Sequence, residues 1–377
     1  MKILYLCTFY HRALLFRQQM DALIAKGHEV RVFSSAQYGE GIAEKFRPIM
    51  DSMVVHCECW NKWDRVFFFP RQWKIEKKLV EAYDLKSFDL LHSHLMLSSG
   101  YTALRMKRKY GLPYVVSVRD TDLTGFIKLP YFKRLAKKIM EESNGILFLS
   151  HTHKKALISM YSNEDTQSMI ENKSVVIGNC VEPFWEENTV TNHKELSNSK
   201  KVRVLTVAKI RPVKNITKAA EAVDLLCGRG YDARLTVVGE NQDNNEFNKI
   251  KSFDHVEILP FMKKEELIDV YKANDIFLLP SLGETFGRVY VEAMTQGLPV
   301  LYTKGEGFDG NFPDGLVGYA VPSDDANAIA DYVEKSVAHY VQLSTEAICH
   351  CKDFYEEIIM KHIEEFYKTA KDNNCSD

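Results

Sequence analysis

The sequence lacks any long apolar run. None of its 377 residues lies in an apolar stretch of the length that a membrane-spanning helix requires. The apolar run near the start soon meets His11 and Arg12, which makes it too brief for the core of a signal peptide. We therefore expect a protein that is made and kept in the cytoplasm.

Neither sign of charge is in excess, and no cysteines have zinc-knuckle spacing. The 49 basic and 51 acidic residues give no general attraction to nucleic acid, so only a local patch can meet a charged partner. The close cysteine pairs, 57 with 59 and 349 with 351, lack the two-residue gap of zinc knuckles, and we expect reduced thiols. A hydrophobic content of 45% and a charged content of 27% exclude a disordered or fibrous chain.

Glycine is missing from the loop that follows the first expected strand. The largely apolar run from Ile3 to Phe9 is typical of a strand buried on both faces of a parallel sheet. The chain continues as Thr8-Phe-Tyr-His-Arg-Ala13, and without glycine this loop cannot form the phosphate-binding turn of a dinucleotide fold. The sequence therefore argues against a nicotinamide or flavin dehydrogenase.

Strand-like and helix-like segments alternate along the chain in two series. The first series has expected strands at 3–9, 29–33, 90–91, 114–118 and 146–149, with a helix at 14–24 that ends at Gly27. The second has expected strands at 202–208, 234–238, 276–280 and 299–302, with a helix at 216–226. This alternation predicts two α/β domains, each with a parallel sheet covered by helices on both faces.

Two further segments set the expected domain boundaries. The polar segment 186–201 has the composition of an interdomain linker. Apolar residues recur at helical spacing between 353 and 371, which predicts a C-terminal helix that crosses back onto the first domain. The predicted domains are residues 1–182 together with 355–377, and residues 183–354.

Three cations follow the first strand of the second series. In open parallel sheets, ligands bind at the carboxyl ends of strands, and Lys209, Arg211 and Lys214 lie there just before a helix. With Pro212 fixing the turn, such a loop can bind a diphosphate and stabilise it as a leaving group. A solvated basic loop is an equally good interpretation of this segment taken alone.

Two glutamates, Glu284 and Glu292, with seven residues between them, lie after another expected strand of the same series. If a helix begins near Phe286, they are separated by roughly 12 Å along its axis, which suits the two ends of a nucleotide sugar. One carboxylate can then accept bonds from sugar hydroxyls and the other from ribose hydroxyls, with the helix amino terminus facing the phosphates. The alternative is an ordinary exposed helix residue and a favourable first-turn anion.

Sequence motifs spread over nearly the whole chain resemble those of one enzyme family. The most specific is Pro280-Ser-Leu-Gly-Glu-Thr-Phe-Gly287 continuing to Glu292-Ala-Met-Thr-Gln-Gly-Leu-Pro299, and the supporting ones are Gly27-His-Glu-Val30, Asp89-Leu-Leu-His-Ser-His94, Ile177-Gly-Asn-Cys-Val181 and Val237-Val-Gly239. In these motifs the chain resembles family 4 glycosyltransferases, the retaining nucleotide-sugar enzymes of the GT-B fold. The resemblance implies two facing Rossmann-like domains, the first for the acceptor and the second for the donor.

The resemblance also implies residue roles in the second domain. It places Glu284 on the transferred sugar, Glu292 on the ribose, and Lys209 and Lys214 on the diphosphate, so that catalysis falls to Lys209, Lys214 and Glu284. The other implied donor contacts are Gly239, Phe261, Thr285, Phe286, Gly287 and Arg288, with the backbone of 286–288 facing the sugar phosphate. We expect a uridine in preference to a guanosine diphosphate sugar, and no metal or other cofactor, because the lysines supply the positive charge.

The chain departs from the family pattern on the expected acceptor side. Phe9-Tyr-His11 replaces two glycines, lysine stands for arginine at 209, and Arg119 occupies a histidine position, with Asp120 and Asp122 beside it. This variant, together with Gly305-Glu-Gly-Phe-Asp-Gly310, resembles bacterial enzymes that build capsule or other surface polysaccharides.

The candidate residues on the acceptor or sugar side are His11, His94, Arg119 and Asp120. For His92 and His94, which follow an apolar strand, a hydrogen-bonded position near the core is as good an interpretation. Metal binding by these histidines is not expected, because no acids have the spacing to complete a site.

Aromatic and basic residues are interleaved in two segments of the first domain, 62–78 and 128–138. Such segments lie on anionic membrane surfaces, so we expect contact with the inner face of the cell membrane and a glycan or polyprenyl-linked acceptor. Core packing is the alternative for the aromatic run, and nucleic acid is not an expected partner. No oligomeric state follows from the sequence.

Two rival functions remain open from the sequence. A nucleotide-sugar epimerase of similar architecture needs only the donor, and a non-catalytic sugar-nucleotide or glycan-binding protein has the fold without the reaction. The presence of both lysines and both glutamates argues against the second rival, because a pure binder has little need to stabilise a leaving group.

Overall fold

The computed structural model describes residues 1–65 and 67–372, which form two compact units. The first unit contains Met1–Leu149, His153–Ile177 and the chain from Met360, and the second contains Ser150–Thr152 and Gly178–Ile359. Residues 150–152, 178–182 and 355–359, which we expected in the first domain, belong to the second unit. There the N–H of Val181 donates to the carbonyl of Phe354 at 3.0 Å. Residues 373–377, also expected in the first domain, lie outside the described residues.

The first unit is built on a seven-stranded parallel sheet of order β3-β2-β1-β4-β5-β6-β7. The strands are β1 Lys2–Leu6, β2 Glu29–Gln37, β3 Val54–Trp60, β4 Leu90–Ser93, β5 Tyr114–Val118, β6 Gly145–Phe148 and β7 Ser174–Val176. Strands β4, β5 and β6 are buried along their whole length, as expected for apolar runs at the centre of such a sheet. The strand order reverses between β1 and β4, which marks the edge where ligands bind in this architecture.

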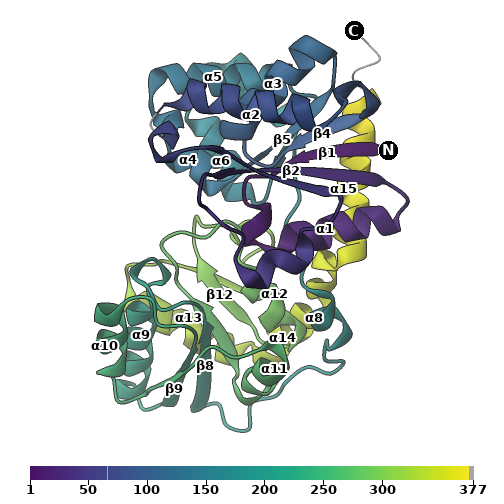
Figure 1. The fold of residues 1–377 in the computed structure, drawn as a ribbon. Helices are drawn as coiled ribbons and strands as arrows, with labels where there is room; N and C mark the ends of the chain where they lie inside the picture. The colour runs from purple at the N-terminus through teal and green to yellow at the C-terminus, as the bar shows by residue number, and fades with distance from the viewer. Residues whose placement is uncertain (66, 373–377) are drawn as a thin grey trace. The chain divides into compact units, whose positions relative to one another are not determined.

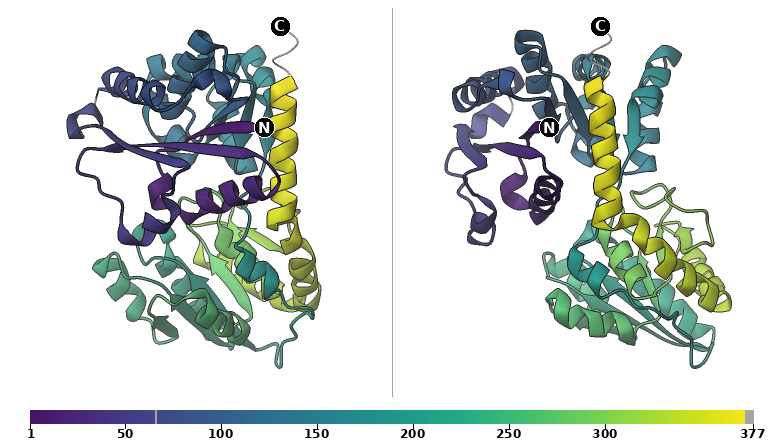
Figure 2. Two further views of the ribbon diagram at one scale, coloured as in Figure 1. Left: turned by 45° about the vertical axis from the view of Figure 1, so that its right-hand side comes forward. Right: turned by 90° about the vertical axis from the view of Figure 1, so that its right-hand side faces the viewer.

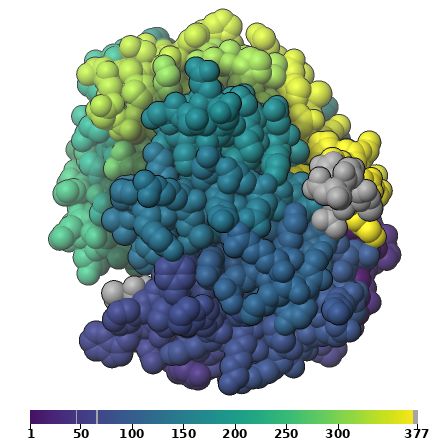
Figure 3. Space-filling view, turned by 90° about the horizontal axis from the view of Figure 1, so that it is seen from above, coloured from purple at the N-terminus to yellow at the C-terminus, as the bar shows by residue number. Residues whose placement is uncertain are grey.

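Helices cover both faces of this sheet, and Figure 1 shows α2, α3 and α5 stacked together on one of them. The helices are α1 Leu14–Ala25, α2 Phe68–Ala82, α3 Ser98–Tyr110, α4 Asp120–Thr124, α5 Pro130–Glu142, α6 His151–Ser159 and α7 Glu164–Lys173, with 3₁₀ turns η1 Tyr10–Arg12, η2 Glu44–Ile49, η3 Lys62–Arg65, η4 Leu85–Ser87 and η5 Phe126–Lys128. In the space-filling view of Figure 3, the blue and teal segments of this unit form a continuous surface.

The last helix, α15 Glu356–Asp372, is a single straight element in both views of Figure 2. From Met360 onward it belongs to the first unit, which confirms the prediction that the C-terminal helix returns to the first domain. The hydroxyl of Tyr367 lies 2.6 Å from Nδ1 of His92 and 3.1 Å from the hydroxyl of Tyr5. These contacts join the end of the chain to β1 and β4.

The second unit contains a six-stranded parallel sheet of order β10-β9-β8-β11-β12-β13. The strands are β8 Lys201–Val207, β9 Asp232–Val238, β10 Val256–Leu259, β11 Ile276–Leu279, β12 Val300–Thr303 and β13 Gly318–Val321. The strand order again reverses at the centre, between β8 and β11. The two predicted parallel-sheet domains are therefore confirmed.

The helices of the second unit pack on both sides of its sheet and close a core of their own. They are α8 Pro183–Glu187, α9 Ile216–Gly228, α10 Asn244–Lys251, α11 Lys264–Ala273, α12 Arg288–Thr295, α13 Ala326–Ala338 and α14 Tyr340–His350, with 3₁₀ turns η6 Pro212–Lys214 and η7 Cys351–Phe354. The expected linker 186–201 is shorter in the structure, because α8 extends to Glu187 and buries Trp185. Within the described parts of the chain, no helix has the length and apolar character needed to cross a membrane.

Candidate functional site

The basic loop of the second unit connects β8 to α9. Its turn η6 begins with Pro212, and Lys214 at the end of the turn lies against the loop that follows β11. The Nζ atom of Lys214 is 2.5 Å from Oε2 of Glu284, and the two side chains are only 14% and 17% exposed. The structure thus brings together two of the predicted catalytic residues, from loops at the carboxyl ends of neighbouring strands.

Lys209, the other predicted lysine, is much more exposed. Its Nζ atom lies 3.8 Å from Oε2 of Glu240, and both side chains are 57% exposed, so this contact leaves the ammonium group open to a ligand. Arg211 is exposed on the same loop. The loop therefore offers one held cation, Lys214, and two that extend into solvent.

Asn215 connects three loops, a role that its position in the sequence did not suggest. Its backbone is in the left-handed region, with φ of 54°, a conformation that asparagine adopts more readily than most residues. From there its Nδ2 atom donates to the carbonyls of Pro280 at 3.0 Å and Ser323 at 2.7 Å. The basic loop is thereby fixed to the loops after β11 and β13.

The backbone of Glu284 is held from the other side by residues 306 and 307. The Glu284 N–H donates to Oε2 of Glu306 at 3.0 Å, and its carbonyl accepts from the N–H of Gly307 at 3.0 Å. A Cβ atom on Gly307 would lie 2.4 to 2.6 Å from backbone atoms of Glu284, Thr285 and Phe286, so only glycine fits there. We name this pair of contacts the 306–307 clamp, which the sequence motif did not reveal.

The helix that carries Glu292 begins later than predicted. We expected its start near Phe286, but α12 begins at Arg288 because Gly287 adopts the left-handed conformation, with φ of 85°, and precedes the first turn. Phe286 instead turns its ring into the core, where it packs against Gly178. Glu292 therefore lies about one turn inside the helix, roughly 6 Å along its axis from Arg288, and not two turns inside.

Glu292 is partly buried, and the pKa of its carboxyl group is shifted from the ordinary value. Burial raises the pKa of its carboxyl group to about 7, an effect that Arg288 opposes and the carboxylate of Glu182 reinforces. Glu182 lies between two cations, with Oε1 3.4 Å from Arg288 and Oε2 3.3 Å from Lys264. Within the described residues, the carboxylate of Glu292 has no hydrogen-bond partner, so it can accept bonds from ligand hydroxyls.

Gly239 and Phe261 follow β9 and β10 at the same edge of the sheet. A Cβ atom on Gly239 would lie 1.8 Å from the carbonyl oxygen of Ala208, so glycine is required for the two loops to approach. Phe261 is 73% exposed, an unusual position for a phenylalanine and one suited to stacking on a flat ligand group. Thr285 is half-buried between Glu284 and Phe286.

The histidines predicted for the acceptor side are buried in the first unit. His92 is hydrogen-bonded to Tyr367 at 2.6 Å and Ser117 at 2.7 Å, and burial lowers its pKa to about 3. His94 stacks on it with ring centroids 4.1 Å apart, and burial lowers its pKa well below the usual value. His92 therefore has the hydrogen-bonded core position that we left open as the alternative. His94 is buried too, but among the described residues neither of its ring nitrogens has a hydrogen-bond partner.

His11 is also buried, after β1. Its Nδ1 atom lies 3.2 Å from Oγ of Ser34, its Nε2 accepts from Nε of Arg12 at 3.2 Å, and its ring contacts that of His56. Burial, with His56 and Arg12 adding to it, lowers the pKa of His11 to about 4. The imidazole of His11 is only 3% exposed, and its contacts hold the conformation of the loop that lacks glycine.

Arg119 and its neighbours lie after β5. The Nε atom of Arg119 donates to the carbonyl of His94 at 3.0 Å, and its guanidinium lies over the ring of Phe16 at 5.0 Å. Asp120 is exposed at the start of α4, whereas Asp122 is buried. Asp122 accepts from the N–H groups of Met96, Leu97 and Arg119 at 3.0 to 3.1 Å, so it orders the loops after β4 and β5.

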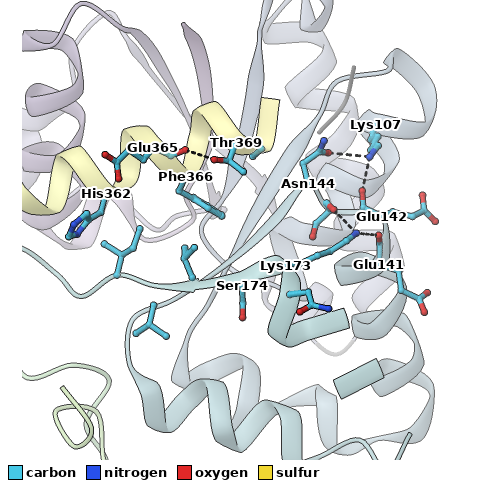
Figure 4. A pocket seen from close by; sticks show the side chains of 16 residues that line it. Lys107, Glu141, Glu142, Asn144, Lys173, Ser174, His362, Glu365, Phe366 and Thr369 are labelled. Atoms are coloured by element: carbon cyan, nitrogen blue, oxygen red, sulfur yellow. Dashed lines mark hydrogen bonds between the residues drawn. The ribbon is translucent and has the colours of Figure 1, made fainter. Parts of the chain in front are cut away.

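A cavity of about 900 Å³ lies elsewhere in the first unit, between the end of α5, strand β7 and α15 (Figure 4). Its lysines are engaged in the fold. Lys107 donates to the carbonyl of Glu142 at 2.8 Å, and Lys173 donates to the carbonyl of Ser143 at 3.0 Å. These bonds satisfy carbonyl groups at the C-terminal end of α5, a structural role. Among the described residues, no group of three histidine, cysteine or acidic side chains is arranged to bind a metal.

Comparison with known proteins gives matches over most of the chain. The family model described as Glycosyltransferase Family 4 matches residues 15–183, and the one described as Glycosyl transferases group 1 matches residues 188–345. The N-acetyl-alpha-D-glucosaminyl L-malate synthase of Bacillus anthracis is 23% identical over 82% of this chain and 80% of that protein. The alpha-monoglucosyldiacylglycerol synthase of Acholeplasma laidlawii is 23% identical over 94% of this chain and 92% of that protein.

Solved structures agree on the fold. The crystal structure of Anabaena HepE in complex with UDP and glucose has a TM-score of 0.67 at 16% identity, and the match covers 98% of this chain and 100% of that one. The seven-stranded parallel sheet of the first unit and the six-stranded parallel sheet of the second have the architecture of GT-B enzymes. Because the two family models match successive parts of the chain, the chain belongs to family 4 of the glycosyltransferases and is a glycosyltransferase of the GT-B fold.

Proposed function

We propose that this enzyme transfers a sugar from a nucleoside diphosphate sugar to a hydroxyl group of a glycan or lipid-linked acceptor, in the synthesis of a bacterial surface polysaccharide. The observation that carries the proposal is the Lys214–Glu284 ion pair at the carboxyl edge of the second sheet, held by Asn215 and by the 306–307 clamp. A pair so fixed can contact a sugar and its phosphate together.

The chemistry follows from the charges at this edge. Lys209 and Lys214 stabilise the negative charge that develops on the diphosphate as the bond from the anomeric carbon to the phosphate oxygen breaks. The amino terminus of α12 adds partial positive charge. Glu284 accepts bonds from the sugar hydroxyls and Glu292 from the ribose hydroxyls. The acceptor oxygen bonds to the anomeric carbon with retention of configuration, its proton passes to the departing diphosphate oxygen, and we assign no enzyme nucleophile or base.

We further propose that the donor is a uridine diphosphate sugar and that no metal takes part. Support for uridine comes from HepE, which was solved with UDP and glucose. Metal independence rests on the two lysines, because their ammonium groups supply the charge that a divalent cation otherwise brings to a diphosphate.

The first unit offers a surface for a membrane. We define the amphipathic surface as Trp63, Phe67, Trp73, Leu129 and Tyr131, which are 76%, 59%, 57%, 53% and 59% exposed. The same two segments carry exposed basic residues, namely Lys62, Lys74, Lys77, Lys78, Lys128, Arg134 and Lys138, and Val66 lies outside the described residues. Exposed rings among basic side chains suit the interface of an anionic bilayer, so we propose that the enzyme is cytoplasmic and peripheral at the inner face of the cell membrane.

The proposed reaction can be tested with a panel of uridine and guanosine diphosphate sugars and a membrane extract as the source of acceptor, with and without chelator. Release of the nucleoside diphosphate that depends on the acceptor, with uridine donors favoured and no effect of chelator, is the expected result. Isomerised donor without transfer would indicate an epimerase, and binding without turnover a non-catalytic protein. Either result would contradict the proposal, and loss of activity with chelator would contradict metal independence.

A further inference from the structure

Glu182 connects the amino termini of three helices of the second unit. It is the residue before α8, and its carboxylate lies between the first residues of α11 and α12. Its Oε2 atom is 3.3 Å from Nζ of Lys264, and its Oε1 atom is 3.4 Å from Nη2 of Arg288. The helix dipole disfavours cations at helix amino termini, so this one carboxylate compensates two unfavourably placed charges.

The same arrangement leaves the carboxylate of Glu292 open to a ligand. Arg288 and Glu292 are four residues apart on α12, so their side chains lie on one face of the helix, where opposite charges often pair. Arg288 pairs with Glu182 instead, and its buried Nε and Nη2 atoms make no hydrogen bond within the described part of the chain. Glu182 therefore competes with Glu292 for a guanidinium that still has donors to give.

The charges that act on Glu292 come from three elements. Burial raises the pKa of its carboxyl group to about 7, and the positive charges of Arg288 and Lys264 oppose this shift, whereas the carboxylate of Glu182 adds to it. From α11, the buried hydroxyl of Tyr271 lies close enough for the charge of Glu292 to add to burial in raising the tyrosine pKa. Two cations and two carboxylates are thus in balance around the position that we assign to the ribose.

We propose that Glu182 is a positioning residue for the donor. By pairing with Arg288 and Lys264, it keeps the guanidinium beside Glu292 without letting the two pair, so that both carboxylate oxygens of Glu292 stay open to the ribose hydroxyls. The inference rests on the proposed function, in which Glu292 binds the ribose. It gives Glu182 no contact with the donor itself.

The test measures UDP binding to the full chain by titration calorimetry at about pH 8.5, above the pKa of Glu292. We expect Glu182→Gln to release Arg288 to Glu292 and to weaken UDP binding about tenfold, because a charge-assisted hydrogen bond to the ribose is lost. The double variant Glu182→Gln with Arg288→Met has no guanidinium to occupy Glu292. It should therefore regain most of the lost affinity, a recovery that two independent structural defects would not give.

The pH dependence of UDP affinity is a second measurement that a merely structural role would not change. Removing the negative charge of Glu182 lowers the pKa of Glu292, so the fall of UDP affinity should occur at lower pH in Glu182→Gln than in the unchanged protein. Removing a positive charge with Lys264→Gln should move it to higher pH. The matched control is Glu187→Gln, the same change at an exposed glutamate at the end of α8, which should alter neither quantity.

Circular dichroism shows whether each variant is folded, and Lys264→Gln still tests the inference if Glu182→Gln does not fold. Three results would each overturn the inference while the proposed function stands. They are undiminished UDP binding by Glu182→Gln at about pH 8.5, a double variant that binds as weakly as the single one, and an unchanged pH dependence in Glu182→Gln or Lys264→Gln. If the unchanged protein does not bind UDP, the proposed function fails, and this inference fails with it.

Discussion

Replacing Lys214 with alanine leaves the carboxylate of Glu284 without its ion-pair partner. The two side chains are 14% and 17% exposed, so the pair is intermediate between surface and fully buried pairs. Surface pairs contribute about 0–1 kcal/mol, whereas removing one partner of a buried pair costs ~3–5 kcal/mol. We therefore expect Lys214→Ala to lower the free energy of unfolding by about 2 kcal/mol. At roughly 2–4 °C per kcal/mol for a domain of this size, the Tm should fall by about 4–8 °C.

Turnover should fall much further than stability. Removing one preorganised group that stabilises developing charge lowers kcat by about 10²–10³-fold, and Lys214 is the held cation of the basic loop. The double variant Lys214→Ala with Glu284→Ala removes the unpaired carboxylate, so its Tm should recover toward that of the unchanged protein while kcat stays low. Scanning calorimetry and release of nucleoside diphosphate measure the two effects.

The control for this experiment is Lys251→Ala, which removes an exposed lysine at the end of α10. It should change neither quantity. Wild-type turnover in Lys214→Ala, or recovered turnover in the double variant, would refute the assignment of leaving-group stabilisation to this lysine. An unchanged Tm in Lys214→Ala would refute the account of the ion pair.

Three further changes test other parts of the site. The affinity for UDP should fall as the pH drops through about 7, because the carboxylate of Glu292 gains a proton there and can no longer accept hydrogen bonds from two ribose hydroxyls. Titration calorimetry of Glu292→Gln should show no such change of UDP affinity with pH. The pKa of Glu292 is near 4.5 in the unfolded chain and about 7 in the folded, ligand-free protein. The group therefore stabilises the folded state fully below pH 4.5, and this stabilisation is lost as the pH rises through 7. Thermal denaturation of Glu292→Gln should lack this dependence on pH. Gly307→Ala forces a Cβ atom against the backbone of Glu284, so we expect kcat to fall at least about tenfold with a lower Tm, and normal kinetics would show that the 306–307 clamp has no role. Replacing Trp63 and Trp73 with serine should reduce cosedimentation with anionic vesicles without weakening UDP binding, and undiminished cosedimentation would contradict the proposed membrane contact.

The strands that sequence patterns predict well are those in the middle of the sheets. β4, β5, β6 and β11 are buried along their whole length, and their largely apolar sequences, interrupted only by His92 and Ser93 in β4 and Ser117 in β5, follow from that burial. The strands not predicted, β3, β7, β10 and β13, lie at sheet edges. β10 has no fully buried position, so its side chains carry neither an apolar run nor a clean alternation. Local patterns record burial, and β3, β7 and β10 have few or no fully buried positions. Burial does not account for β13, which is buried along its whole length.

The site could be predicted as residue types but not as an arrangement. Lys214 and Glu284 were identified individually, yet their pairing joins positions 70 residues apart. The bond between Glu284 and Glu306 spans 22 residues, and the two bonds of Asn215 span 65 and 108. The late start of α12 has a similar cause, since the apolar Phe286 fits a helical pattern but its ring fills a gap beside Gly178 that only the fold creates.

The hydrogen bonds of Tyr367 to His92 and Tyr5 have a consequence for the order in which the chain folds during synthesis. The strands β1 and β4 leave the ribosome early, but the helix that completes their core contains the last described residues of the chain. Every strand of the second unit is synthesised in between. The second unit can therefore fold while the first is still waiting for α15, so the domain that is made first is the one that is finished last.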